Sequence, residues 1–235
     1  MGQKPCKCFK KMKKIIIFGG AGFIGRNVAK YFIKKNISIT IFDIKKKISM
    51  PGVKFKYIQG SITNEKKVDK ALKNIDYIFH FAGEADIYSA NKNPLNAVKK
   101  NVLGTAIILD KAIKNKIKKI IFASSIYVYS EQGGVYRTTK QSCELLIENY
   151  SQNFGLTYVN LRFGSLYGDD ANEFNFINQM IISAIKTGRM QRRGDGNEIR
   201  SYVNIDDVAK YCYLVLQKKY KNKNIMIFGK ESKSI

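Results

Sequence analysis

Short apolar runs rich in Ile, Val and Phe recur along the chain, separated by longer segments in which polar and apolar residues are mixed. Such runs predict buried strands, and the segments between them predict helices. The predicted strands are Lys14–Phe18, Ile37–Phe42, Lys54–Ile58, Ile75–Phe81, Lys119–Ala123, Thr157–Leu161 and Asn224–Phe228. The predicted helices span about 23–35, 64–73, 94–114, 136–153, 173–187 and 206–218.

This repeated alternation of strand and helix predicts an α/β fold, in which a doubly wound parallel sheet carries helices on both faces. The length of 235 residues suits one large domain, or one domain with a partial second. The first residues differ from this pattern. Residues 1–12, MGQKPCKCFKKM, are basic and lack periodicity, which predicts a disordered extension.

The charge of the chain is strongly positive, with 42 Lys and Arg against 18 Asp and Glu, a net charge of +24. A polyanion-binding protein is therefore one hypothesis. The basic residues are mostly Lys scattered along the chain, however, whereas sequence readers rely on Arg for bidentate base contacts. We therefore expect no specific nucleic-acid partner.

The chain contains no apolar run near the roughly 18 residues of a membrane span, and its N-terminus lacks the apolar region of a signal peptide. These features favour a cytoplasmic protein. The cysteines, Cys6, Cys8, Cys143 and Cys212, are then expected to be reduced thiols. The Cys6-x-Cys8 pair has no second pair nearby to complete a closed zinc site, so no metal is predicted.

The first predicted strand runs into a glycine pattern, with Gly19, Gly22 and Gly25 just before a helix. Glycines let the backbone approach a pyrophosphate, and the helix N-terminus then presents N–H groups and a positive dipole end to that anion. Asp43 ends the second strand, at the spacing from which an acid accepts hydrogen bonds from ribose hydroxyls. The pattern predicts a dinucleotide site that favours NAD over NADP.

Ser124 and Ser125 end the fifth predicted strand, at the edge where parallel sheets bind ligands. Tyr136 and Lys140 follow with Y-x-x-x-K spacing at the start of a helix, so they share one helix face. We expect the Lys140 ammonium to lower the pKa of the Tyr136 phenol, which then takes a proton from a substrate alcohol while Ser125 holds its oxygen. This spacing alone would also fit a surface pair, but the preceding fingerprint favours catalysis.

Together these segments resemble the extended short-chain dehydrogenase/reductases, specifically the NAD-dependent epimerase/dehydratase family acting on nucleotide sugars. The matching segments are GGAGFIG (19–25), Asp43, HFAG (80–83), NVLGT (101–105), SSIYVY (124–129), YRTTK (136–140), LRFGSLYG (161–168) and RSYVNIDDVA (200–209). The resemblance implies a Rossmann domain over residues 13–165. It implies that residues 166–235 add the last sheet strand and part of a substrate-binding region.

The resemblance also implies roles for single residues. The cofactor would be bound by Gly19, Gly22, Phe23, Ile24, Gly25, Asp43, Ser61, Ile62, Phe81, Ala82, Gly83, Asn101, Tyr136 and Lys140. The catalytic group would be Ser125, Tyr136 and Lys140, and the nucleotide-diphosphate sugar would contact Ser124, Ser125, Ser165 and Arg200. His80, the single histidine of the chain, is expected to be a packed strand residue.

Within the family, the resemblance favours a C4 epimerase that acts through a keto intermediate in surface polysaccharide precursor synthesis. Dehydratases carry acidic residues where this chain has Ile126 and Tyr127, so dehydration is disfavoured. The remaining alternatives are a sugar dehydrogenase or ketoreductase, a dehydratase of the same family, and a non-catalytic NAD-binding protein. A homodimer formed through the helices at about 94–114 and 136–153 is expected by resemblance.

The sequence departs from the family pattern in the segment between Ser125 and Tyr136, which is shorter than usual and normally carries substrate contacts. Ser61 stands where the family usually has an Asp that binds adenine. Family members also continue well past the last sheet strand, so we expect a truncated C-terminus and an incomplete cover over the sugar.

Overall fold

A computed structural model describes residues 13–46, 48–50, 54–173, 175–190, 199–229 and 232–234. The predicted disordered extension, residues 1–12, lies outside the described residues, as do Cys6 and Cys8. In the described part of the chain, no helix has the length and apolar character needed to cross a membrane.

A seven-stranded sheet forms the centre of the molecule, and all of its neighbouring strands pair in parallel. In spatial order its strands are β3 (Lys56–Gln59), β2 (Ser38–Asp43), β1 (Lys14–Phe18), β4 (Tyr77–His80), β5 (Lys119–Ser125), β6 (Thr157–Phe163) and β9 (Lys223–Ile227). The predicted α/β fold with a doubly wound parallel sheet is therefore confirmed, with strand ends that differ from the prediction by up to two residues.

The segment that forms β1 is a continuous apolar run because the strand is buried on both faces of the sheet. Ile15 and Ile17 pack into the core on one face of the sheet, whereas Ile16 and Phe18 pack into the core on the other. All of these side chains are fully buried. A strand covered on both faces has no solvent side, so it shows no alternation of polar and apolar residues.

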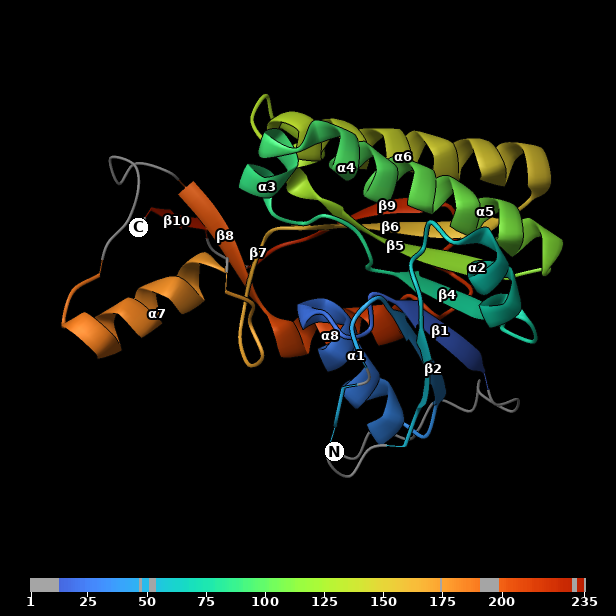
Figure 1. Cartoon of the computed structure of the whole chain (residues 1–235), viewed down its shortest axis with the longest axis horizontal. Coiled ribbons are helices and arrows are strands. Elements are labelled where there is room, and N and C mark those ends of the chain that lie inside the picture. The colour runs from blue at the N-terminus through green and yellow to red at the C-terminus, as the bar shows by residue number, and fades with distance from the viewer. Residues whose placement is uncertain are drawn as a thin grey trace.

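Helices cover both faces of the sheet (Figure 1). One face carries α1 (Phe23–Lys34) and α8 (Ile205–Leu214), which supply Phe32 and Cys212 to its core. The opposite face carries α2, α5 and α6. These helices span Glu65–Leu72, Gly104–Lys114 and Gly134–Phe154 and bury Leu72, Ile108 and Ile147 against the sheet.

Two predicted helices differ from the structure. The helix expected over 94–114 consists of α4 (Pro94–Val98), a wide π-helical turn, η1 (Lys99–Leu103), and α5. The turn contains the buried Asn101, whose side chain bonds to a neighbouring loop rather than following the helical surface pattern. The helix expected over 206–218 ends at Leu214, because the buried Lys119 binds the carbonyl groups that follow it.

Short elements escape prediction. They are α3 (Ile87–Lys92), the 3-10 turn η2 (Ile126–Tyr129) and the strands β7 (Ser165–Tyr167), β8 (Ile199–Asn204) and β10 (Ser232–Ser234). Most of these offer too few positions for a hydrophobic period to be recognised. Helix α3 depends instead on a cap, since the Asp86 carboxylate accepts a hydrogen bond from the Tyr88 amide at 3.0 Å.

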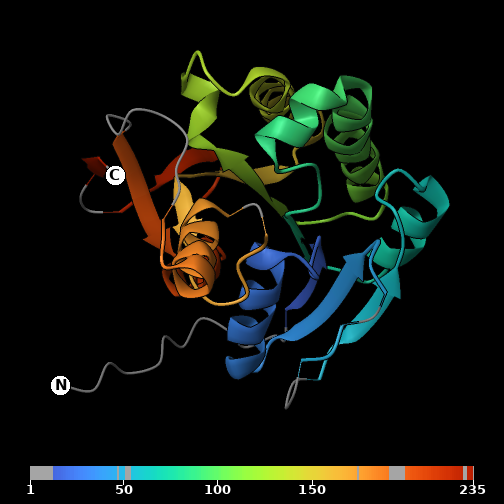
Figure 2. The same ribbon diagram turned by 60° about the vertical axis from the view of Figure 1, so that its left-hand side comes forward.

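A second, three-stranded sheet of β10, β8 and β7 stands beside the carboxyl edge of the main sheet, together with α7 (Phe176–Thr187) (Figures 1 and 2). The loop after β7 attaches this region to α1. Asp170 accepts hydrogen bonds from Lys30 at 2.6 Å and Arg26 at 3.3 Å, and Asn27 binds the Asp169 carbonyl at 3.1 Å. The attachment orients the second sheet towards the glycine turn that precedes α1.

We expect Phe32→Ala to lower the free energy of unfolding by about 3–5 kcal/mol, the usual cost of an aromatic cavity in a core. Phe32 is fully buried, and its ring centroid lies 5.1 Å from that of Phe79. Urea denaturation would measure the change. Ile44→Ala is the control, because Ile44 is 63% exposed and its truncation should cost less than about 0.5 kcal/mol. Equal losses in the two variants would contradict this account of the core.

Candidate active site

The strand order of the main sheet reverses between β1 and β4, because β1 leads to β2 on one side while β4 lies on the other. In open parallel sheets, ligands bind outside the carboxyl ends of the strands at such a point. The predicted site residues at the ends of β1, β2, β4 and β5 share this edge of the sheet. The topology therefore brings the predicted cofactor residues and the predicted catalytic residues to one region.

The glycine turn approaches the end of β4 so closely that a side chain has no room. Gly19 has a φ of +79°, and a Cβ built there would lie 2.5 Å from the Ala82 nitrogen. Gly22 takes the cap position of α1 in extended conformation, and no side chain of the described residues caps this helix. The amide groups of Phe23 and Ile24 thus begin a helix whose N-terminus is open to an anion.

Asp43 connects the end of β2 to the glycine turn. Its carboxylate accepts hydrogen bonds from the Ala21 amide at 2.9 Å and the Lys45 amide at 3.0 Å, and the residue is 8% exposed. Each carboxylate oxygen retains a second lone pair. Asp43 therefore organises the turn and keeps acceptor capacity for ribose hydroxyls.

The predicted adenine contacts follow β3. The Ser61 hydroxyl lies 2.7 Å from that of Thr63, so it is engaged within its own turn. Ile62 is 7% exposed and packs over Gly104, where a Cβ would lie 2.5 Å from its side chain. Ile62 therefore packs against α5. Only the small part of its surface that solvent reaches would be able to contact a cofactor.

Ser125, Tyr136 and Lys140 come together between the end of β5 and the buried face of α6. Tyr136 and Lys140 are 9% and 7% exposed. The Lys140 ammonium donates to the Ala123 carbonyl at 2.7 Å and lies 5.7 Å from the centroid of the Tyr136 ring. The Ser125 hydroxyl oxygen accepts the Tyr127 amide hydrogen at 3.3 Å.

The structure corrects the expected acidity of Tyr136. Burial raises the pKa of this phenol to about 12, and the Ser125 hydroxyl opposes the rise. The prediction that the pKa of Tyr136 is lowered is therefore wrong for the protein alone, because burial of the side chain disfavours the charged phenolate. Burial also lowers the pKa of Lys140, so the region as a whole disfavours charge.

The start of α6, which positions Tyr136, is fixed by a neighbouring helix. Gly133 and Gly134 have φ values of +96° and +50°, which turn the chain into α6. The Asn91 side chain of α3 accepts the Val135 amide hydrogen at 2.9 Å. A Cβ on Gly134 would collide with Asn91, so glycine is required for this contact.

Asn101 orders the loop after β4 that contains Phe81, Ala82 and Gly83. Its side chain accepts the Glu84 amide hydrogen at 2.7 Å, and donates to the Glu84 carbonyl at 3.1 Å and the Thr139 hydroxyl at 2.9 Å. Because Thr139 precedes Lys140 on α6, Asn101 fixes the loop after β4 relative to α6.

His80 is a packed residue of β4. It is 1% exposed, and its Nε2 lies 2.9 Å from the Thr105 hydroxyl. Burial, and to a smaller extent the charge of Lys140, lower its pKa to about 3. The imidazole is therefore neutral at physiological pH.

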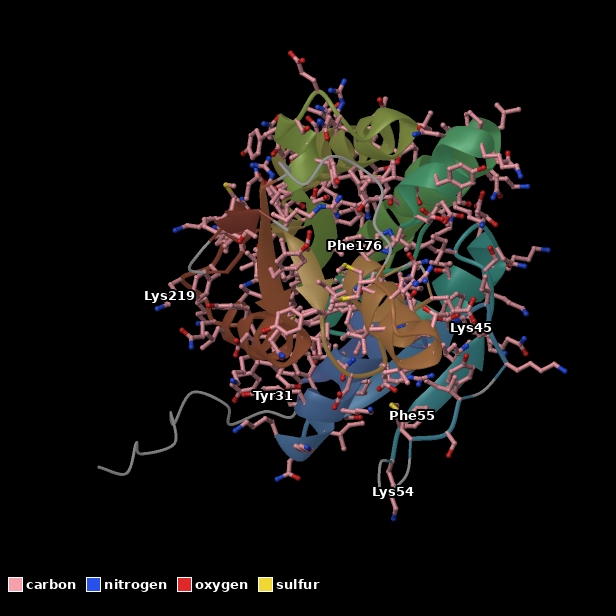
Figure 3. All side chains as sticks on the ribbon, turned by 90° about the vertical axis from the view of Figure 1, so that its left-hand side faces the viewer. Tyr31, Lys45, Lys54, Phe55, Phe176 and Lys219 are labelled. Carbon is pink, nitrogen blue, oxygen red and sulfur yellow. The ribbon has the colours of Figure 1, made fainter. Side chains whose placement is uncertain are left out.

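Ser165 and Arg200 belong to β7 and β8 of the second sheet and not to the Ser–Tyr–Lys group. The Arg200 guanidinium lies 5.2 Å from the centre of the Phe176 ring, at the start of α7. Phe176, the first residue of α7, is labelled in Figure 3 at the upper edge of the orange ribbon of that helix. The predicted substrate residues thus lie beside the region that carries the predicted catalytic residues.

Sequence reasoning missed a buried ion pair beside the site. Arg162 of β6 binds both carboxylate oxygens of Glu144 on α6, and the two side chains are 10% and 7% exposed. Burial raises the pKa of Glu144, and the Ser124 hydroxyl opposes the rise. Ser124 pairs in register with Arg162, and its buried hydroxyl has no hydrogen bond of good geometry to any described residue. The four-residue spacing between Lys140 and Glu144 indicated only that these two side chains share one helix face, and it gave no signal for the pairing of Glu144 with Arg162.

Known proteins are similar to this chain in sequence. Residues 15–228 match the model of the NAD dependent epimerase/dehydratase family. A relative from Arabidopsis thaliana, named as a trifunctional UDP-glucose 4,6-dehydratase, UDP-4-keto-6-deoxy-D-glucose 3,5-epimerase and UDP-4-keto-L-rhamnose-reductase, is 28% identical over 239 residues. That match covers 88% of this chain but spans only 36% of the length of the relative.

Solved structures are similar as well. The UDP-glucose 4-epimerase of Thermotoga maritima, solved with UDP-glucose, has a TM-score of 0.85 and 26% identity, covering 94% of this chain and 78% of that one. The UDP-glucuronic acid 4-epimerase of Bacillus cereus, solved with UDP-glucuronic acid and NAD, has a TM-score of 0.86 and 26% identity, covering 94% of this chain and 79% of that one.

The buried His80 predicts a pH dependence of stability. An unfolded histidine has a pKa near 6.5, whereas that of folded His80 is lowered to about 3, so between these values the unfolded state binds the additional proton. Stability should therefore fall as the pH drops below about 6.5. We would measure the free energy of unfolding of the wild type and of His80→Asn by urea titration at pH 7 and pH 5. The difference between the two proteins should shift by about 2 kcal/mol against the wild type as the pH falls from 7 to 5. Because the chain has one histidine, a constant difference would contradict a neutral His80.

Proposed function

Because the chain belongs to the NAD-dependent epimerase/dehydratase family, we propose that it interconverts the C4 epimers of a nucleotide sugar. The sugar alcohol is oxidised to a 4-keto intermediate and reduced again on its other face. One arrangement carries the proposal, namely Ser125, Tyr136 and Lys140 at the carboxyl edge of the sheet that also bears the glycine turn.

The residues at this edge fit NAD. The absence of a side chain at Gly19, the uncapped N-terminus of α1 and the remaining acceptor capacity of Asp43 suit the backbone, pyrophosphate and ribose of a dinucleotide. NAD, when bound, supplies a reversible hydride acceptor. Asn101 would keep the loop with Phe81, Ala82 and Gly83 in place against it.

The side chains of this chain would manage the proton and the orientation of the sugar. In its phenolate form, Tyr136 would take the proton of the C4 hydroxyl during oxidation, and the resulting phenol would return that proton during reduction. Ser125 accepts a backbone amide hydrogen with its oxygen, which leaves its own hydroxyl hydrogen to donate to the C4 oxygen. Lys140, fixed by the Ala123 carbonyl, would hold the nicotinamide ribose.

Epimerisation is favoured over dehydration by the residues after Ser125. Removing water from the sugar requires a further acid and base, and this chain has Ile126 and Tyr127 there. The nearby Glu144 is bound by Arg162 and cannot supply that group. Two structural neighbours, by their names, are 4-epimerases of UDP-glucose and UDP-glucuronic acid.

The nucleotide diphosphate would lie near the second sheet, where the Arg200 guanidinium suits a diphosphate and Ser165 offers a hydroxyl group. The Ser124 hydroxyl, by contrast, is buried on β5 of the main sheet. A cytoplasmic location and a role in surface polysaccharide precursor synthesis complete the proposal.

The proposal predicts that the chain, incubated with NAD and a panel of UDP-, dTDP- and GDP-sugars, forms the C4 epimer of one of them. Tyr136→Phe should lower kcat by at least about 100-fold, because the Tyr136 phenolate is the proposed proton acceptor and phenylalanine has no oxygen to replace it. Chromatographic separation of the sugar nucleotides would measure both rates.

Tyr129→Phe is the matched control, because Tyr129 is 65% exposed and keeps its aromatic ring in this variant. Undiminished turnover by Tyr136→Phe would remove the proposed role of Tyr136. A dehydrated or oxidised product from the native chain would replace the epimerase with a dehydratase or a dehydrogenase.

We further propose a homodimer formed through the helices that cover one face of the sheet. Leu103 and Leu145, on η1 and α6, are 48% and 67% exposed, which is a high exposure for leucine side chains. Helices α5 and α6 pack side by side on the outer surface, so they offer one continuous face (Figure 1).

Light scattering at micromolar concentration should give a dimer for the native chain and a monomer for Leu103→Glu/Leu145→Glu, because two charges would be buried in the interface. Ile185→Glu on α7 is the control, since Ile185 is 80% exposed outside this surface and its variant should remain dimeric. A monomeric native chain would refute the homodimer.

A further inference from the structure

The segment that joins Ser125 to α6 is short, and it includes the single turn η2 followed by Ser130. We call residues 126–130 the linker loop. The loop lies at the end of β5, directly after the proposed catalytic Ser125 and shortly before the proposed catalytic Tyr136. The loop therefore follows one of these side chains directly and leads towards the other.

Three side chains from two neighbouring elements contact successive residues of the linker loop. Gln141 of α6 donates from Nε2 to the Val128 carbonyl at 2.9 Å. The Arg162 guanidinium of β6 lies 4.4 Å from the centre of the Tyr129 ring. Arg137 of α6 donates to the Ser130 carbonyl at 2.6 Å.

Arg162 is itself a rigid support. Its guanidinium forms hydrogen bonds to both carboxylate oxygens of Glu144, and the pair is largely buried between β6 and α6. A planar guanidinium group that binds both oxygens of a carboxylate has little rotational freedom. The ring of Tyr129, although 65% exposed, therefore rests on a fixed surface.

The loop in turn orients the proposed catalytic residues. The Tyr127 amide donates to the Ser125 hydroxyl oxygen at 3.3 Å, which determines where the remaining hydroxyl hydrogen can point. The Tyr127 ring packs edge-on against Tyr136, with ring centroids 6.4 Å apart and planes at 82°. Movement of the loop would therefore displace both the Ser125 hydroxyl and the surroundings of the Tyr136 phenol.

We propose that Arg137, Gln141 and Arg162 are positioning residues that hold the linker loop in its catalytic conformation before substrate binds. The inference rests on the proposed function, because it assigns these side chains a role in orienting Ser125 and Tyr136. The catalytic geometry is then present in the protein before the sugar binds. Substrate binding therefore does not have to supply the conformational entropy that ordering the loop would cost.

The test uses two near-isosteric variants that each remove a hydrogen-bond donor to the loop. Gln141→Glu places a carboxylate against the Val128 carbonyl, and Arg137→Met removes the donor to Ser130. Ser142→Ala is the matched control on the same helix, because its hydroxyl bonds to the Thr138 carbonyl of α6 itself. Circular dichroism and thermal unfolding would establish that each variant is folded.

Hydrogen exchange of the linker loop is the first readout. The Ser130 amide donates to the Tyr127 carbonyl at 2.9 Å, so it reports on closure of the turn. We expect exchange of the 126–130 amides to quicken by at least about tenfold in Gln141→Glu and Arg137→Met, and to be unchanged in Ser142→Ala. Arg137→Lys, which keeps a donor, should restore slow exchange.

Epimerase kinetics are the second readout. Displacing reacting groups should lower kcat by roughly 10- to 100-fold, while KM for the sugar nucleotide and the calorimetric affinity for NAD stay within about twofold. Faster exchange with unchanged kcat would overturn the positioning role, and so would unchanged exchange in both variants. If the native chain turns over no nucleotide sugar, the proposed function fails while the exchange data still decide whether these residues hold the loop.

Discussion

Burial of the main sheet on both faces is the constraint from which the arrangement of the site follows. Strands β1, β4 and β5 are covered by α1 and α8 on one side and by α2, α5 and α6 on the other, so their interiors hold apolar side chains. Polar side chains can then gather only where the strands end. Parallel pairing makes these ends coincide, and residues as distant in sequence as Gly19, Asp43 and Ser125 share one edge.

Several polar groups that are buried near this edge find partners within the protein. Lys140 binds the Ala123 carbonyl, Asn101 binds both backbone groups of Glu84, and Arg162 binds Glu144. An unpaired buried charge or amide would be costly, so these contacts leave each side chain a single orientation. The same pairing that keeps the fold stable therefore fixes the geometry of the candidate site.

The apolar runs and the glycine pattern were sufficient to predict the strands of the main sheet and its fold class, because both signals are local in sequence. The sequence also placed Ser125, Tyr136 and Lys140 in one region, and the structure brings them together. The partner of Arg162 was not predictable, since β6 and α6 meet only through tertiary packing. Turn η2 was missed for a related reason, because side chains of other elements hold it in place.

The acidity of Tyr136 shows how spacing and environment act separately. The Y-x-x-x-K spacing places an ammonium near a phenol, but burial raises the pKa of Tyr136 to about 12 and lowers that of Lys140. Both shifts favour the neutral form, so the environment outweighs the attraction between the two groups. The buried region has a lower effective dielectric constant than water. A positive charge added beside Tyr136 would therefore lower the pKa of its phenol more strongly than the same charge would in water. A site of this kind keeps the Tyr136 proton in place in the protein alone and responds sharply to a charged molecule that binds beside it.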